Sequence, residues 1–191
     1  WQVIANAGVG SAAALAYLWR PESAFLGAYA ASFAAANADT WASEIGVLSR
    51  AKARSLITLR PVRTGASGGV SLLGLAASVA GGGFIACVTL SGLLLLPTTI
   101  PWGLSDLLIL GVILSGSGLL GSLIDSLLGA GLQALYRDEA GVPTERSGDG
   151  ERKYPLIKGV RWITNDMVNF LSILIASVVA LLLLLTLVPI G

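Results

Sequence analysis

The sequence Asn-Ala-Asp-Thr-Trp-Ala-Ser-Glu, residues 37–44, interrupts an apolar run that extends from Ser23 to Leu48. The run is long enough to cross a bilayer as a helix, which needs about 20 predominantly apolar residues. Its carboxylates are costly there, because an ionised side chain near the bilayer centre costs on the order of 3 kcal/mol or more. A membrane helix that retains such a cluster is predicted to use it in function.

The composition predicts a polytopic membrane protein. Of the 191 residues, 54% are hydrophobic and 12% are charged, whereas an average soluble domain has about 25% charged residues. The mean hydropathy is +0.79. The chain has no histidine, which excludes histidine-based catalytic triads and histidine metal sites, and its single cysteine, Cys87, excludes an internal disulfide.

The apolar runs predict an all-α bundle of about five membrane-spanning helices, forming one domain over residues 1–191. The helices are expected at about residues 3–19, 23–48, 70–96, 104–136 and 162–187. The fourth is longer than a bilayer requires, so we expect it to tilt, to break near Gly116 and Gly118, or to project into water. The sequence begins at Trp1 rather than at a methionine, so a further helix could precede it.

The basic residues predict the topology. Apart from Arg20, every lysine and arginine lies in the loops at residues 49–69 and 137–161. With five spans, both loops face the same side, which the positive-inside rule assigns to the cytoplasm. We therefore expect a multi-pass protein of a plasma or thylakoid-type membrane with both basic loops in the cytoplasm. The same charges could instead serve as contacts with lipid headgroups.

Acidic and amide side chains from three distant segments are predicted to reach one depth, at the cytoplasmic ends of their helices. They are Asp39 and Glu44 of the second helix, Asp125 of the fourth, and Asn165, Asp166 and Asn169 at the start of the fifth. On the second helix, Asn37 and Glu44 share a face and Asp39 points to the opposite side, because successive residues turn by about 100°.

Some of these residues have structural alternatives. Asp125 could be an interhelical hydrogen-bond anchor, Asn165 could act as a helix cap, and Asp166 could complement the helix dipole. The face of the fourth helix that carries Asp125 also has small residues at Gly118, Gly121 and Gly129. We expect these glycines to leave room for a ligand or a metal.

The loop before the third helix has the sequence Thr-Gly-Ala-Ser-Gly-Gly-Val-Ser at residues 64–71. Small residues at a helix N-terminus present backbone N–H groups at the positive end of the helix dipole, which suits phosphate. The residues predicted to hold phosphate are Gly65, Ser67, Gly68, Gly69 and Ser71, with Arg60 and Arg63 neutralising charge. The Gly-Lys-Ser/Thr ending of a Walker A motif is absent.

Carboxylates that bind Mg²⁺, a phosphate-binding loop and arginines are the requirements of phosphoryl transfer. The predicted Mg²⁺ ligands are Asp39, Glu44 and Asp125, and the amides predicted to orient ligands are Asn37, Asn165 and Asn169. Because the site lies where water meets lipid, the expected acceptor is a lipid alcohol or lipid phosphate, and a soluble nucleotide enters from the cytoplasm. No nucleic-acid partner is expected.

Four motifs resemble a family of integral membrane proteins typified by human transmembrane protein nineteen, which includes the phytyl-phosphate kinase of tocopherol and phylloquinone biosynthesis in plants and cyanobacteria. They are residues 37–46, residues 64–71, Gly-Ser-Leu-Ile-Asp-Ser at 121–126 with Gln133 downstream, and Thr-Asn-Asp-Met-Val-Asn-Phe at 164–170. The resemblance implies phosphoryl transfer from a nucleoside triphosphate, with CTP favoured, to an isoprenoid monophosphate of the phytyl or geranylgeranyl type. Ala66 departs from the acidic or polar residue expected in many relatives.

The leading hypothesis is therefore a Mg²⁺-dependent isoprenoid-monophosphate kinase whose catalytic residues are Asp39, Glu44, Asp125 and Asp166. The alternative is a membrane transporter or flippase in which these acids relay protons or cations. Transporters often carry internal repeats and place their sites near the midplane, whereas here the polar layer lies at one face and no repeat is evident. A non-catalytic lipid-binding scaffold is a third alternative.

Overall fold

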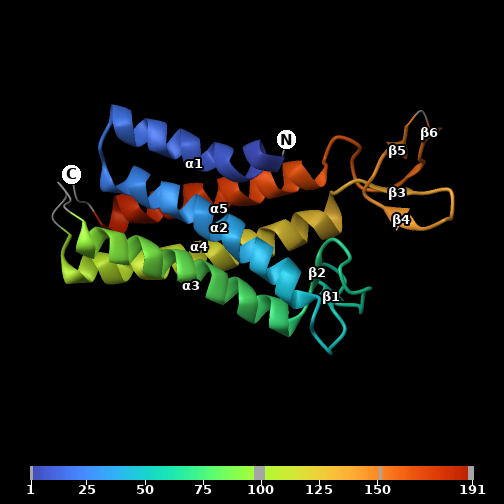
Figure 1. Ribbon diagram of the computed structural model, residues 1–191, viewed down its shortest axis with the longest axis horizontal. Coiled ribbons are helices and arrows are strands. Elements are labelled where there is room, and N and C mark those ends of the chain that lie inside the picture. The colour runs from blue at the N-terminus through green and yellow to red at the C-terminus, as the bar shows by residue number, and fades with distance from the viewer. Residues whose placement is uncertain (1, 97–101, 151, 189–191) are drawn as a thin grey trace.

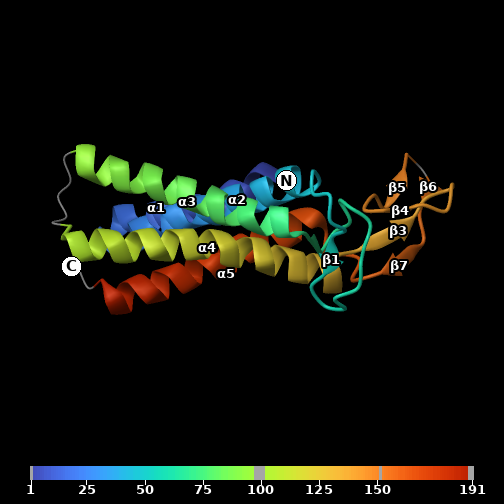
Figure 2. The same ribbon diagram turned by 90° about the horizontal axis from the view of Figure 1, so that it is seen from below.

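The computed structural model describes residues 2–96, 102–150 and 152–188. Most of this part of the chain is helical, and the helices run side by side in one bundle (Figures 1 and 2). The helices are α1 (Gln2–Trp19), α2 (Ser23–Gly46), α3 (Leu72–Leu95), α4 (Leu104–Gly131) and α5 (Asn165–Leu187). The prediction of a helical bundle is confirmed, and the helices follow in the predicted order.

The fourth helix differs from its predicted length. α4 ends at Gly131 rather than at Tyr136, and it continues through residues 116–118 without a break. Beyond Gly131 the backbone forms hydrogen bonds with a distant segment instead of within the helix, since Ala134 N donates to Ile163 O at 2.8 Å. Pairing with the segment that precedes α5 therefore replaces the helix that was predicted for residues 132–136.

In the described part of the chain, three helices are long and apolar enough to cross a membrane, namely α3, α4 and α5. α1 is apolar but shorter, and α2 lies outside this group. Length and composition thus support three of the five predicted spans. α2 contacts each of the other four helices. Contacts with four helices reduce the surface that α2 presents to lipid, while Thr40, Ser43 and Glu44 near its end are exposed.

Small residues allow this enclosure of α2. Ala34 and Ala38 have no exposed surface. A Cβ added to Gly81 of α3 would lie 3.0 Å from Ala38 Cα, and one added to Gly121 of α4 would lie 2.6 Å from Ala35 Cβ. Backbones approach this closely in membrane bundles only where side chains are small.

The prediction that the glycines of α4 leave room for a ligand is wrong. A Cβ on Gly118 would lie 2.6 Å from Gly82 Cα of α3, and one on Gly129 would lie 2.6 Å from Ser67 Oγ. The glycine face of α4 therefore holds α3, α2 and the loop at residues 64–71 in contact with this helix.

Short strands lie at one end of the bundle, where only loops were predicted (Figure 1). β1 (Arg54–Ser55) pairs antiparallel with β2 (Gly69–Val70), and β5 (Gly148–Asp149) pairs with β6 (Arg152–Lys153). A three-stranded sheet has β3 (Leu135–Arg137) between β4 (Pro143–Thr144) and β7 (Leu156–Lys158). Strands of two or three residues are too short to show a periodic pattern in the sequence. The ends of α2 and α4 and the starts of α3 and α5 meet at this end (Figure 2).

We expect Gly118→Ala to destabilise the bundle, because the added Cβ would lie 2.6 Å from Gly82 Cα. Overpacking of this kind costs about 1–3 kcal/mol. Gly116→Ala is the matched control, since nothing lies within 4 Å of a Cβ there and replacing a helical glycine by alanine is favourable by roughly 0.5–1 kcal/mol. Thermal unfolding in detergent should move in opposite directions for the two variants. Equal midpoints would contradict the close contact between α3 and α4.

Candidate active site

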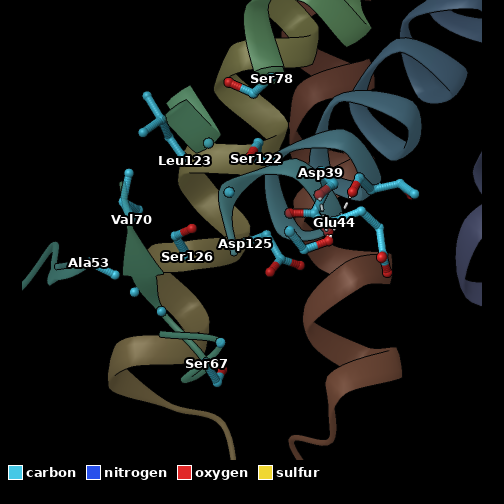
Figure 3. Close-up of a pocket in the computed structure, with 18 of the residues that line it drawn as sticks. Asp39, Glu44, Ala53, Ser67, Val70, Ser78, Ser122, Leu123, Asp125 and Ser126 are labelled. Atoms are coloured by element: carbon cyan, nitrogen blue, oxygen red, sulfur yellow. Dashed lines mark hydrogen bonds between the residues drawn. The ribbon is translucent and has the colours of Figure 1, made fainter. Parts of the chain in front are cut away.

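A cavity of about 460 Å³ lies at the end of the bundle that carries the strands (Figure 3). Its walls come from α2, α3, α4 and α5, from the loop at residues 64–71, and from Asn6 and Glu145. The predicted site residues that line it are Asp39, Glu44, Gly65, Ser67, Gly68, Gly69, Ser71, Asp125, Asn165 and Asn169. Segments far apart in the sequence therefore meet around one cavity.

The carboxylates of α2 both belong to this cavity. Asp39 and Glu44 line it (Figure 3), although helical phasing predicted that they point to opposite sides. Thr40 and Ser43 line it as well, so the cavity wraps around the last turns of α2. The Ser43 hydroxyl donates to Asp39 O at 3.0 Å and is thereby bonded to its own helix.

On the opposite wall, Asp125 joins α4 to α5. Ser172 Oγ donates to Asp125 Oδ2 at 3.4 Å, and Asn165 and Asn169 from the first turns of α5 line the same cavity. Asp125 is thus an interhelical hydrogen-bond partner, as the structural alternative supposed. Because it also faces the cavity, this role does not exclude a functional one.

In the described part of the chain, the cavity is lined by acidic side chains and lacks basic ones. Its carboxylates come from Asp39, Glu44, Asp125 and Glu145, and no lysine or arginine of the described residues lines it. Carboxylates that share a site repel each other when ionised, so this cavity favours a cation.

The donor set fits a magnesium ion that binds together with phosphate. Among the described residues, no three aspartate, glutamate, cysteine or histidine side chains gather closely enough to form a metal site by themselves. Mg²⁺ is usually held by one or two carboxylates together with waters and substrate phosphates. Asp39 and Asp125, which face one cavity from different helices, supply such a pair. The predicted role of Glu44 as a third ligand stays a prediction.

The loop at residues 64–71 is docked on the end of α4. Gly65 and Gly68 have φ angles of +79° and +76°, a conformation that glycine adopts without steric cost. A Cβ on Gly68 would lie 2.3 Å from Ala130 N. Ser67 Oγ donates to Gln133 Oε1 at 2.7 Å. The C-terminal end of α4 therefore positions the loop that was predicted to hold phosphate.

Ser71 has a structural task at the start of α3. Its hydroxyl accepts from Gly74 N at 3.0 Å and donates to Gly46 O at 3.2 Å, which caps α3 and ties it to the end of α2. This hydroxyl is therefore engaged within the protein. The other first-turn N–H groups of α3 have no acceptor within the helix and suit an anion at the positive end of its dipole.

Some predicted site residues do not line the cavity, namely Asn37, Arg60, Arg63 and Asp166. Asn37 Nδ2 donates to Gly81 O at 2.9 Å and so joins α2 to α3. The two arginines are exposed in their loop. Asp166 lies in the first turn of α5, where a carboxylate complements the helix dipole. The cap of α5 is Thr164, not Asn165.

Sequence reasoning missed Asn6 and Glu145, which line the cavity from α1 and from the loop after α4. Asn6 had a signal, because it is an amide within an alanine-rich apolar helix. Glu145 had none, since it lies in a charged loop without a periodic pattern and only the folded loop brings it to the cavity.

Comparison with known proteins assigns the chain to a family. The model of the integral membrane protein family DUF92 matches residues 1–177. The chain belongs to this family. Protein PGR of Arabidopsis thaliana is 37% identical over 156 residues, which cover 81% of this chain and 53% of PGR. An uncharacterized membrane protein of Methanocaldococcus jannaschii, MJ0933, is 35% identical over 107 residues, which cover 53% of this chain and 38% of that protein.

The chain thus spans about half the length, or less, of these curated relatives. No solved structure matches it. The comparisons support the family and its membrane character, while the kinase suggested by the motifs remains a proposal.

We expect Gly68→Ala to displace the loop at residues 64–71 more than Gly65→Ala does. Both glycines have positive φ, so each substitution carries a backbone cost of roughly 1–2 kcal/mol. Only at Gly68 does the added Cβ also meet the α4 backbone, whereas at Gly65 the nearest atom is a Val47 methyl group at 4.0 Å. Hydrogen exchange of the loop amides measures the difference. Equal exchange in both variants would contradict docking on α4.

From the Ser67–Gln133 hydrogen bond we expect that a second substitution restores the stability lost when Ser67 is replaced. Gln133 is 3% exposed and its Nε2 has no partner in the described part of the chain. Ser67→Ala would leave both polar ends of this buried amide unpaired and cost about 1–3 kcal/mol. Adding Gln133→Leu should recover most of that loss, because it removes the orphaned groups. Unfolding free energies of the two single variants and the double variant test this, with Ser126→Ala as the control; additive losses would contradict it.

Proposed function

We propose that the protein is a membrane-bound kinase that transfers a phosphoryl group from a nucleoside triphosphate to an isoprenoid monophosphate. One observation carries the proposal: carboxylates of α2 and α4 line the same cavity as a glycine-rich loop at the N-terminus of α3 (Figure 3). Membership of an integral membrane family supports a lipid acceptor. The resemblance to phytyl-phosphate kinases favours CTP as the donor and a phytyl or geranylgeranyl chain on the acceptor.

The glycine-rich loop is the proposed site of the nucleotide phosphates. Gly65 and Gly68 let the backbone adopt the turn that lines the cavity, and the first turn of α3 adds the positive end of a helix dipole. Residues 64–66 are exposed, which suits entry from water. The positive-inside rule places this face of the bundle in the cytoplasm, where nucleotides are available.

The transfer step demands little covalent chemistry from the protein. An oxygen of the acceptor phosphate attacks the γ-phosphorus, the bond from the γ-phosphorus to the β–γ bridging oxygen breaks, and the nucleoside diphosphate leaves with the bonding electrons. A phosphate dianion has no proton to remove, so the step needs no general base, which suits a chain without histidine. Asn165 and Asn169, which line the cavity, would orient the acceptor by hydrogen bonds.

Asp39 and Asp125, with Glu44 beside them, would hold Mg²⁺. Bound Mg²⁺ supplies neutralisation of charge across the phosphate oxygens. This matters here because no basic side chain of the described residues lines the cavity, so the protein itself offers the phosphates few positive charges. Arg60 and Arg63 do not line the cavity, so they would stabilise the phosphate charge only from a distance.

The position of the cavity favours an enzyme over the alternative of a transporter or flippase. Transporter sites typically lie near the midplane of the bilayer, between repeats. Here the carboxylates lie near the end of α2 and less than two turns from the end of α4, beside the extramembrane loops.

Activity should depend on the carboxylates that line the cavity. We expect purified protein with Mg²⁺, CTP and geranylgeranyl monophosphate to form the diphosphate, and Asp39→Asn and Asp125→Asn to lower the rate by roughly 100-fold or more, because preorganised charge is lost. Radiolabelled donor and chromatography of the lipid product measure the rate. ATP should be compared with CTP as donor.

Asp106→Asn is the control, since Asp106 accepts from Gly103 N at the start of α4, remote from the cavity. Asp166→Asn tests whether this acid acts without lining the cavity. The proposal fails if no triphosphate supports turnover and no nucleotide raises the unfolding temperature. Nucleotide-independent lipid or ion flux in liposomes would instead favour transport.

A further inference from the structure

α3 and α4 are in close contact at one level of the bundle. A Cβ on Gly82 would lie 2.9 Å from Ser115 O and 3.1 Å from Gly118 Cα. Nearer the loops, residues from both helices line the cavity, namely Gly74, Leu75 and Ser78 of α3 and Ser122, Leu123 and Ser126 of α4. The cavity therefore reaches into a slot between these helices, bounded on one side by the glycine contact.

The slot is bounded on its other side by the docked loop, where Gly68 meets Ala130. The neighbouring seam between α2 and α3 is closed, since a Cβ on Gly46 would lie 3.2 Å from Gly74 Cα. Both helices that flank the slot are long and apolar enough to cross a membrane. A ligand that extends through the slot would thus pass between two helices with lipid-facing surface.

The slot is lined by two leucines, Leu75 and Leu123, together with the small residues Gly74, Ser78, Ser122 and Ser126. Leu75 and Leu123 are partly buried, and the cavity wall continues to Val70 of β2 and to Ala53, which precedes β1. The hydroxyl of Ser78 donates to Leu75 O at 2.8 Å, so it is bonded to its own helix. In Figure 3, Ala53, Val70 and Leu123 lie on one side of Asp125, and Asp39 and Glu44 lie on the other.

The cavity therefore has two chemical ends. One has carboxylates that suit a cation with phosphate, and the other has leucines and small uncharged residues between two membrane helices. One turn from the slot leucines, Val79 and Leu127 are 48% and 49% exposed and continue the apolar surface outward. A single molecule with a phosphate head and a hydrocarbon chain matches both ends, whereas a soluble phosphate leaves the apolar end unfilled.

The geometry points to the slot between α3 and α4 as the binding site for the hydrocarbon chain of a lipid monophosphate, with Leu75 and Leu123 as the side chains that contact it. This inference rests on the proposed function for the identity of the head group. The hydrocarbon chain of the lipid enters from the bilayer between α3 and α4. Its phosphate then reaches Asp125 from the slot.

Photo-crosslinking tests this without turnover. Protein in lipid nanodiscs is incubated with geranylgeranyl monophosphate that carries a diazirine on its chain, irradiated without nucleotide, and mapped by mass spectrometry. We expect saturable labelling of residues 72–79 and 122–127. An n-alkyl monophosphate should compete and inorganic phosphate should not, which separates a chain-binding site from a plain phosphate site.

Leu123→Trp should reduce saturable labelling by at least about tenfold, equivalent to about 1.4 kcal/mol, because the larger ring fills the slot. Leu108→Trp is the matched control and should label like wild type, because Leu108 is an exposed leucine near the other end of the same helix and does not line the cavity. The wild-type map keeps the inference testable if Leu123→Trp does not fold.

Saturable labelling confined to α1 or α5, unchanged labelling in a folded Leu123→Trp, or no saturable labelling would each overturn the inference. Labelling of the slot without phosphoryl transfer would retain the chain-binding site and reject the kinase. Transfer that is unaffected by Leu123→Trp would retain the kinase and reject the slot.

Discussion

α2 can lie among four other helices only because it presents alanine where its neighbours present glycine. Its alanines at positions 34, 35 and 38 are almost completely buried, against Gly118, Gly121 and Gly81. In a bilayer, water does not drive apolar helices together, so close van der Waals contact between small residues must supply the association energy. The remaining features of the molecule follow from this arrangement.

Because α2 lies among other helices, its acidic C-terminal turns can line a cavity between helices. Asp39 and Glu44 lie in its last turns and line a cavity walled by α3, α4 and α5, so they need not face lipid. Ser71 ties the start of α3 to the end of α2. The carboxylates are thus carried on packed helices rather than on a loop, which suits groups that must hold a fixed geometry.

α4 links the carboxylates to the glycine-rich loop at residues 64–71. Asp125 lines the cavity, Gly129 lies one turn later beneath Ser67, and Gln133 accepts the Ser67 hydrogen bond just beyond the helix. With a rise of about 1.5 Å per residue, one helix sets the spacing between an acid and the loop. A kinase needs such fixed spacing, because its rate depends on positioning phosphates more than on covalent chemistry.

The sequence by itself determined the membrane class, the helices and the end of the bundle where the site lies. Apolar runs of bilayer length specify helices, and the alternation of loops places Asp39, Asp125, Asn165, Asn169 and residues 64–71 at one level. These are properties of length and order along the chain, which need no knowledge of contacts. The loss of the last turns predicted for α4 and the short strands depended on pairing between distant segments, so local patterns could not predict them.

Only the tertiary structure decided which polar residues share the cavity. Asn37 bonds across to α3, Asp166 stays at a helix start, and Glu145, which had no signal in its loop, reaches the cavity. Likewise, the glycines of α4 hold neighbours in contact instead of leaving space. Helical phase gives the direction of a side chain relative to its own axis. What lies in that direction depends on how small residues on distant helices pack, and this is settled only when the bundle assembles.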